Sequence, residues 1–596
     1  MIYVGIINFG DENHVKYDLV SLLNPYLEEY STLVKKPFLT LCYGKLSNVQ
    51  DMDDVWEDTS SITLGRVFDK LQQCSLSKEQ FKELSYLDTK DKLEKIWGKY
   101  IYINRKNYFE FEIVIDSTGQ LPFFYHVLSN GNILFSSEID LIFKVIGQKH
   151  EYNWAYLCSY LIYGPSSATQ TPFQNIYELP PGCHLILTKN EQETRPFWNP
   201  LSSYQCSDKT QGNAVEILQT TLKPWITPYK NIYVSLSGGV DSSALVYSLK
   251  DIIRENQKLC ALNYFHSSIK SSNELTHARR VCKETGIHLI EVDISNTLPF
   301  DPSVKKNIFR PNKPFSGLVS EQLVDNVFQH LDVEESYTFL SGNGSDHIFM
   351  RPPSKKYLAD YLLENGLKGS IAHLKTLSQF YRDPFLSILK ENAISLVSYF
   401  FSKRYCKRDL KTMKKESPQW INLSAYQNAS FDFIHPIYDC LPAKLLPGKY
   451  EQIDALYDAL SSINVEMSPL TPTYYPFLYQ GVVEFALAFH TYDLCCNGYD
   501  RYPLRKAISD HFKTDTVWRR DKSQIGGVLQ LGIKKNIKYI LDVCLEGHLI
   551  KQKFIDKEGL YKTIMQIANG NITGIRSFMN IVCIELFLRH WEEKSL

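Results

Sequence analysis

The sequence contains no continuous apolar stretch approaching the roughly 20 residues that a membrane-spanning helix needs, so a membrane protein is not expected. Neither charge sign dominates, because 65 Lys and Arg face 66 Asp and Glu. Without a global basic field, nucleic acid is not expected as a partner. The 13 cysteines include no C-x-x-C pair, which argues against a zinc site and favours reduced thiols in a cytoplasm. The remaining composition is that of a globular chain with roughly two to four domains.

A glycine turn stands between a predicted strand and a predicted helix. The apolar residues Ile232, Val234 and Leu236 alternate with Tyr233 and Ser235, which is typical of a strand. The sequence then reads S-G-G-V-D-S-S, and the following apolar spacing predicts a helix. Free N–H groups and the helix dipole make such a turn an anion site, and glycines allow the ligand to approach the backbone. The residues expected to contact a phosphate group are Leu236, Ser237, Gly238, Gly239, Val240, Asp241, Ser242 and Ser243.

The aspartate in this turn narrows the choice of ligand. The turn lacks the lysine of a G-x-x-x-x-G-K-[ST] loop, and it is not a G-x-G-x-x-G loop. Asp241 would repel a polyphosphate unless Mg²⁺ lay between them. The turn therefore predicts a site for pyrophosphate with a metal ion. The alternative interpretation is an ordinary tight turn that begins a helix.

The pattern of predicted elements changes near residue 205. Residues 1 to about 205 consist mostly of strand-like segments, whereas later segments alternate strand and helix, as in a parallel sheet with helical connections. A second glycine turn, S-G-N-G-S-D, follows the predicted strand Tyr337–Leu340. If both strands lie in one sheet, Asp241 and Asp346 converge across the phosphates, and each could hold a Mg²⁺. Beyond about residue 355 the chain is predicted to be helical.

These motifs together resemble the asparagine synthetase family of N-type ATP pyrophosphatases along nearly the whole chain. The first half contributes IDSTGQLPFFYHVLSNGNILFSSEIDLI, and the second contributes both glycine turns, YPFLYQGVVEFAL and DRYPLRKAI. The resemblance implies an α/β protein with an N-terminal nucleophile (glutaminase-like) αββα domain, residues 1–205. A synthetase domain, residues 206–596, would follow, with an adenine-nucleotide α-hydrolase-like parallel sheet and a helical C-terminal part.

The resemblance also implies ATP and Mg²⁺ as cofactors and assigns roles to individual residues. Ser341 and Gly342 of the second turn would join the first turn in binding ATP, and Asp241 and Asp346 would hold the metal. Lys522 would stabilise the tetrahedral intermediate that forms from an acyl-adenylate. The alternative for Lys522 is a surface lysine in a charged run.

The sequence departs from asparagine synthetases in its first domain. Those enzymes need a cysteine as their first mature residue, whereas here Ile2 follows Met1 and the first cysteine is Cys42. Glutaminase chemistry is therefore expected to be absent. The amine would then come from elsewhere, most simply from the substrate.

The C-terminal segments favour one branch of the superfamily. Asparagine synthetases carry Glu, Arg and Asp at the positions of Pro472, Tyr474 and Tyr479, so free aspartate is not the expected substrate. The β-lactam synthetases carry a tyrosine at the position of Asn343. Residues 472–487 and 498–512 instead resemble those of the lasso peptide cyclases.

The function that this resemblance implies is an ATP-dependent macrolactam-forming ligase. It would adenylate an Asp or Glu side chain of a precursor peptide and close an isopeptide ring with the N-terminal amine. The implied partners are that precursor peptide, a leader-peptide recognition protein and a leader peptidase. The alternatives are a small-molecule amide ligase and a non-catalytic peptide-binding pseudoenzyme. A basic stretch, Lys403–Lys415, is either a solvated loop or a docking face for an acidic partner.

Overall fold

The computed structural model describes most of the chain. The described residues are 1–9, 17–27, 31–45, 54–70, 74–84, 87–205, 213–269, 274–302, 309–331, 335–401, 418–422, 433–466, 473–520 and 526–592. Within these ranges, no helix is both long enough and apolar enough to cross a membrane.

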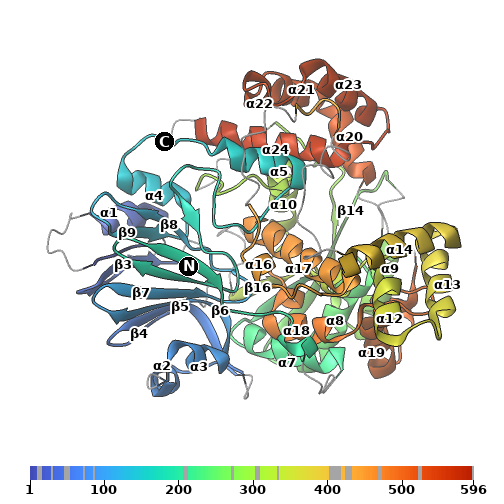
Figure 1. Ribbon diagram of the computed structural model, residues 1–596, viewed down its shortest axis with the longest axis horizontal. Helices are drawn as coiled ribbons and strands as arrows, with labels where there is room; N and C mark the ends of the chain where they lie inside the picture. Colours follow the sequence, from blue (N-terminus) through green and yellow to red (C-terminus); the bar gives the residue numbers. More distant parts are fainter. Residues whose placement is uncertain are drawn as a thin grey trace.

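Two antiparallel sheets stack face to face in the first part of the chain (Figure 1). One sheet contains, in spatial order, β10 (Tyr177–Glu178), β8 (Phe124–Val127), β9 (Ile133–Ser136), β1 (Ile2–Ile7), β3 (Leu39–Gly44) and β2 (Thr32–Lys36). The other contains β12 (Gln192–Pro196), β11 (Cys183–Thr188), β7 (Glu110–Ile115), β6 (Ile96–Asn107), β5 (Ser61–Asp69) and β4 (Asp54–Glu57). Alternate side chains of both sheets form the buried layer between them, which includes Tyr3, Leu41, Ile62 and Ile113.

Helices cover the outer faces of this pair of sheets. The helices α1 (Leu19–Leu23), α4 (Ile139–Ile146) and α5 (Trp154–Tyr163) share a hydrophobic cluster with the sheet that contains β1. The helices α2 (Lys78–Glu83) and α3 (Thr89–Glu94) place Phe81 and Leu93 against the other sheet. The predicted αββα layering is confirmed. Cys42, the first cysteine of the sequence, is fully buried in β3, and burial raises the pKa of its thiol.

A five-stranded parallel sheet follows in the second part. Its spatial order is β15 (His288–Asp293), β14 (Lys258–Phe265), β13 (Asn231–Ser235), β16 (Tyr337–Leu340) and β17 (Thr473–Tyr474). Every neighbouring pair in this sheet is parallel. The predicted parallel sheet is thus confirmed, and the carboxyl ends of β13 and β16 lie side by side at one edge.

Helices flank the parallel sheet and make up most of the remaining chain. The helices between residues 202 and 348 are α6 (Ser202–Gln205), α7 (Ala214–Ile226), α8 (Val240–Ile252), α9 (Leu275–Thr285), α10 (Glu321–Phe328) and α11 (Ser345–Ile348). Those that follow are α12 (Tyr357–Asn365), α13 (Ser370–Tyr381), α14 (Phe385–Phe401), α16 (Ile437–Cys440), α17 (Pro447–Glu466), α18 (Gln480–Ala488) and α19 (Tyr502–Phe512). The last are α20 (Gly526–Lys535), α21 (Ile537–Leu545), α22 (His548–Lys551), α23 (Lys557–Ala568) and α24 (Ile575–Glu592).

The two parts of the chain share buried side chains. The C-terminal helix α24 packs against α5, and Trp591 near its end contacts the ring of Phe173 at a centroid distance of 4.5 Å (Figure 1). On another side, Trp225 of α7 contacts Phe68 of β5 and Trp97 of β6. The predicted boundary between residues 205 and 206 adjoins residues 206–212, which lie outside the described residues, and it stays a prediction.

Candidate active site

The two glycine turns meet at the edge of the parallel sheet. Gly238 has φ of +74°, and a Cβ there would lie 2.6 Å from the Cβ of His277, so a larger residue would strain the turn. In the second turn, a Cβ on Gly342 would lie 2.9 Å from the backbone nitrogen of Ser242. The turns therefore touch each other, and glycine at these two positions permits the close approach.

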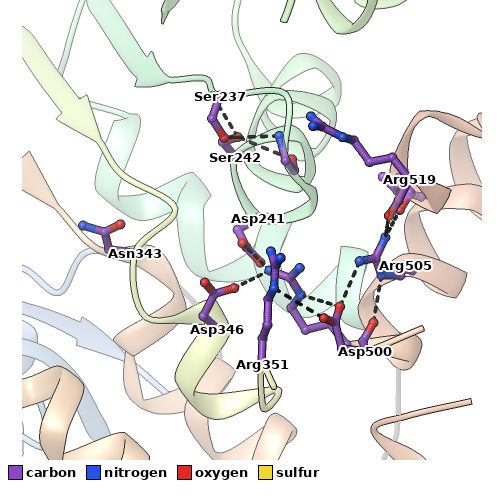
Figure 2. Close-up of polar contacts among 12 residues, drawn as sticks. Ser237, Asp241, Ser242, Asn343, Asp346, Arg351, Asp500, Arg505 and Arg519 are labelled. Carbon is purple, nitrogen blue, oxygen red and sulfur yellow. Dashed lines mark hydrogen bonds and ion pairs between the residues drawn. The ribbon is translucent and has the colours of Figure 1, made fainter. Parts of the chain in front are cut away.

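Internal hydrogen bonds hold the first turn in shape. Ser242 Oγ accepts a bond from the backbone N–H of Ser237 at 3.2 Å, and Ser237 Oγ accepts one from the N–H of Gly239 at 3.2 Å (Figure 2). Leu236 donates its N–H to Leu262 on the neighbouring strand at 2.8 Å. Ser243 is buried below the turn. The hydroxyl groups thus shape the turn, and the N–H groups at the start of α8 are the donors best placed for an anion.

The second turn is joined to the last strand of the sheet. Ser341 donates its N–H to the carbonyl of Tyr474 at 2.9 Å, which continues the pairing of β16 with β17. Asn343 is exposed, and its N–H contacts Ser341 Oγ at 3.3 Å. All of the predicted ATP-binding residues therefore lie on two adjoining turns, while their contacts with ATP stay a prediction.

The two predicted metal ligands converge on one cation, which is an arginine. Asp241 lies in the first turn of α8, and Asp346 lies in the first turn of α11. Arg501 Nη1 is 2.6 Å from Asp241 Oδ2 and also contacts Asp346 Oδ1. Two carboxylate oxygens within reach of one point suit a hard divalent cation, so the residues fit Mg²⁺. A metal ion at that point would require the Arg501 side chain to move.

A buried charge network holds Arg501 in place. Arg501 Nε is 3.1 Å from Asp500 Oδ1, and the same oxygen accepts a bond from Arg505 Nη2 at 2.9 Å. Burial alone would lower the pKa of Arg501, but the charges of Asp241, Asp346 and Asp500 raise it above its ordinary value. Burial likewise opposes ionisation of Asp500, yet the adjacent arginines lower its pKa. Both groups are therefore charged at neutral pH.

Sequence reasoning missed Asp500 and Arg501. The segment DRYPLRKAI carries the family resemblance, but its spacing assigns no role to its first two residues. Arg501 lies 260 positions from Asp241 and adopts a left-handed conformation with φ of +51° just before α19. The available signal was the pair Asp-Arg ahead of a helix in a segment already linked to the family.

Buried aromatic rings occupy the positions at which asparagine synthetases carry Arg and Asp. Tyr479 stacks on Trp225 with ring centroids 4.7 Å apart, and the hydroxyl of Tyr474 lies 3.2 Å from that of Tyr229. Tyr474 and Tyr479 are 2% and 1% exposed. The chain therefore carries buried aromatic rings and no charged group at these two positions, and the identity of the substrate stays a prediction.

Three of the predicted features lie outside the described residues. These are Lys522, Pro472 and the basic stretch Lys403–Lys415. Their roles stay predictions. Among the described residues, no group of three or more His, Cys, Asp or Glu side chains forms a metal site, so a metal ion here would depend on the two aspartates together with ligands from the substrate.

Comparison with known proteins gives matches in both parts of the chain. Residues 84–198 match a glutamine amidotransferase domain, and residues 230–420 and 464–589 match asparagine synthase. The chain is 24% identical over 294 residues to the Microcin J25-processing protein McjC of Escherichia coli, which covers 49% of this chain and 48% of that protein. It therefore spans about half the length of this curated relative.

Two solved structures are also similar to part of the chain. The NH3-dependent NAD synthetase from Campylobacter jejuni is 16% identical with a TM-score of 0.19, and the match covers 33% of this chain and 96% of that one. The U34-tRNA thiolase NcsA from Methanococcus maripaludis is 18% identical with a TM-score of 0.18, covering 38% and 76%. Because the asparagine synthase match extends over more than half of the sequence, the chain belongs to the asparagine synthase family of ATP-dependent ligases.

Proposed function

We propose that the chain is an AMP-forming carbon–nitrogen ligase that closes a macrolactam ring in a precursor peptide. An oxygen of an Asp or Glu side chain bonds to the α-phosphorus of ATP, and the bond to the bridging oxygen breaks, so that pyrophosphate leaves. The N-terminal amine of the same peptide then attacks the acyl carbon and releases AMP. Membership of the asparagine synthase family supports ATP-dependent ligase activity, and ring closure in a peptide is the proposal that goes beyond it.

The observation that carries the proposal is the convergence of Asp241 and Asp346 beside the glycine turns. Their oxygens reach a common point at the carboxyl ends of β13 and β16, next to the N-terminus of α8. We assign the turns to the phosphates and the two aspartates to Mg²⁺, which when bound offsets the negative charge of the polyphosphate. Lys522 is assigned to the acyl transfer step.

A peptide substrate is supported by two features. Tyr474 and Tyr479 bury aromatic rings where asparagine synthetases carry charges, so the amino acid substrate of those enzymes loses its partners. The chain is also similar to a protein whose name states that it processes microcin J25. The proposed helpers are a leader-peptide recognition protein and a leader peptidase, which frees the amine.

The experiment combines a leader-cleaved precursor peptide, Mg–ATP and the purified protein. Ring closure is expected to lower the peptide mass by one water and to yield AMP. Asp241→Ala and Asp346→Ala should each abolish pyrophosphate release, whereas Asp251→Ala should not. Asp251 is a matched control because it lies near the far end of α8 and is partly exposed.

Other outcomes separate the alternatives. A cyclised small amino acid together with AMP would favour a small-molecule ligase. Peptide binding without any AMP or pyrophosphate would favour the pseudoenzyme. Wild-type pyrophosphate release by either aspartate variant would remove the argument for the metal site.

A further inference from the structure

Six arginines line a cavity of about 230 Å³ beside the N-terminus of α8, which we call the arginine cavity. They are Arg351, Arg382, Arg501, Arg505, Arg519 and Arg520. Gly239 and Val240 of the first glycine turn also line it, so the cavity opens directly onto the proposed phosphate site. Within the described part of the chain, Asp500 is its one acidic lining residue.

Arg501 and Arg505 are the most buried of these arginines, and both are ion-paired within the protein. Arg501 binds the aspartates described above. Arg505 is buried, and its guanidinium donates to Asp500, to the carbonyl of Arg519 at 3.1 Å and to the carbonyl of Val517. These two side chains therefore build the wall of the cavity and fix its acidic residue.

Arg351, Arg382 and Arg520 present charge closer to solvent, whereas Arg519 is ion-paired with Glu274 at 3.0 Å. Arg382 and Arg520 are exposed, and the Arg351 side chain is 26% exposed at 3.5 Å from Asp500. Arg519 Nη1 donates to the carbonyl of Gly238 at 3.1 Å, which ties the cavity to the first turn. Arg351 and Arg505 both reach the carboxylate of Asp500 (Figure 2). The guanidinium groups of Arg351, Arg382 and Arg520 therefore favour an anion with several negative charges.

We propose that the arginine cavity binds the pyrophosphate that leaves ATP, through Arg351, Arg382 and Arg520. This assignment rests on the proposed function and adds residues that neither glycine turn contains. The bridging oxygen leaves the α-phosphorus with the pyrophosphate, and negative charge grows on that group during the step. The guanidinium groups that line the cavity lower the free energy of that charge. Their planar shape also allows two parallel hydrogen bonds to one phosphate.

The test measures binding of inorganic pyrophosphate to the intact protein by calorimetry, without nucleotide, peptide or Mg²⁺. Arg382→Gln and Arg520→Gln should each weaken binding by about tenfold, and the double variant should weaken it further. Both side chains are exposed, so the variants are expected to fold, and circular dichroism checks this. Arg279→Gln is the control, because Arg279 is an exposed arginine that pairs with Glu291 and does not line the cavity.

The pyrophosphate affinity of the double variant decides whether the proposal stands. Unchanged pyrophosphate affinity in the double variant would overturn the proposal, as would equal affinity for inorganic phosphate and pyrophosphate. If a separate titration with the leader-cleaved peptide shows weaker binding to the double variant while its pyrophosphate affinity is unchanged, the cavity binds an acidic part of the peptide instead. Since the assay contains no peptide, its result is independent of ring closure, and failure of ring closure alone would count against the proposed function only.

Discussion

Replacing Arg501 with glutamine should allow Asp241 and Asp346 to bind Mg²⁺ in the absence of nucleotide. In the wild-type protein, the Arg501 guanidinium lies at the point where both carboxylates would reach a metal ion. Magnesium must therefore displace a buried side chain, which is 2% exposed, before it binds. Glutamine removes that competing charge and leaves both ligands in place.

The expected size of the effect follows from the charge network. Breaking a buried ion pair costs about 3–5 kcal/mol. The lower end, about 3 kcal/mol, applies here because Asp241 and Asp346 are 15% and 30% exposed. At about 1.4 kcal/mol per tenfold change, Mg²⁺ should bind Arg501→Gln about 100 times more tightly than it binds the wild type. Asp500 keeps its contact with Arg505 at 2.9 Å, so the variant should still fold.

Calorimetric titration with Mg²⁺ measures this difference directly. The double variant Arg501→Gln with Asp241→Asn should lose the added affinity, and Arg279→Gln should match the wild type. A rise in melting temperature with Mg²⁺, larger in Arg501→Gln than in the wild type, provides a second measurement. Equal Mg²⁺ affinity in the wild type and Arg501→Gln would refute the idea that the guanidinium and the metal ion compete.

Three further changes test other parts of the structure. Gly342→Ala should push the two glycine turns apart and lower kcat/KM for ATP by about 10²-fold. Gly526→Ala is the control and should have little effect, because a Cβ there meets nothing within 4 Å. Similar losses of kcat/KM in both variants would contradict the contact between the turns. Burial raises the pKa of Glu138 to about 8, so the folded state keeps a proton that the unfolded state loses above its ordinary pKa of 4.5. The stability of the folded state should therefore fall as pH rises from 4.5 to about 8. Glu138→Gln should raise the melting temperature at pH 8 but not at pH 4.5. If the melting temperatures of the wild type and the variant change with pH in the same way, Glu138 is not the cause. Lys522→Ala should slow amide formation by about 10²–10³-fold with unchanged nucleotide affinity, and normal rates would leave it as a surface lysine.

The part of the site that could be predicted depends on local sequence and on sheet geometry. The alternation before Leu236 and the glycines after it predict a strand, a turn and a helix, and the structure contains them in β13 and α8. The convergence of Asp241 and Asp346 follows from one further step, because the carboxyl ends of parallel strands share an edge.

The arginines could not be predicted in this way. Arg351, Arg382 and Arg519 come from separate segments, and their meeting depends on how helices pack after the sheet has formed. No spacing in the sequence links them. Arg501 adds a second difficulty, since its left-handed conformation before α19 directs the side chain toward a turn 260 positions away. Long-range packing of this kind carries no short motif.

The contacts of Trp225 bear on whether the two parts of the chain can be separated. Its ring lies between Phe68 and Trp97 of the first part and Tyr479 of the second. Arg66 of β5 also donates to the carbonyl of Pro224 at 3.0 Å and lies over the Trp225 ring at 4.7 Å. A fragment containing only the second part would expose this aromatic surface to water and remove the ring of Trp97 from its contact with Tyr479. The first part thus stabilises the ligase part by packing against α7, and the two parts are expected to unfold as one cooperative unit.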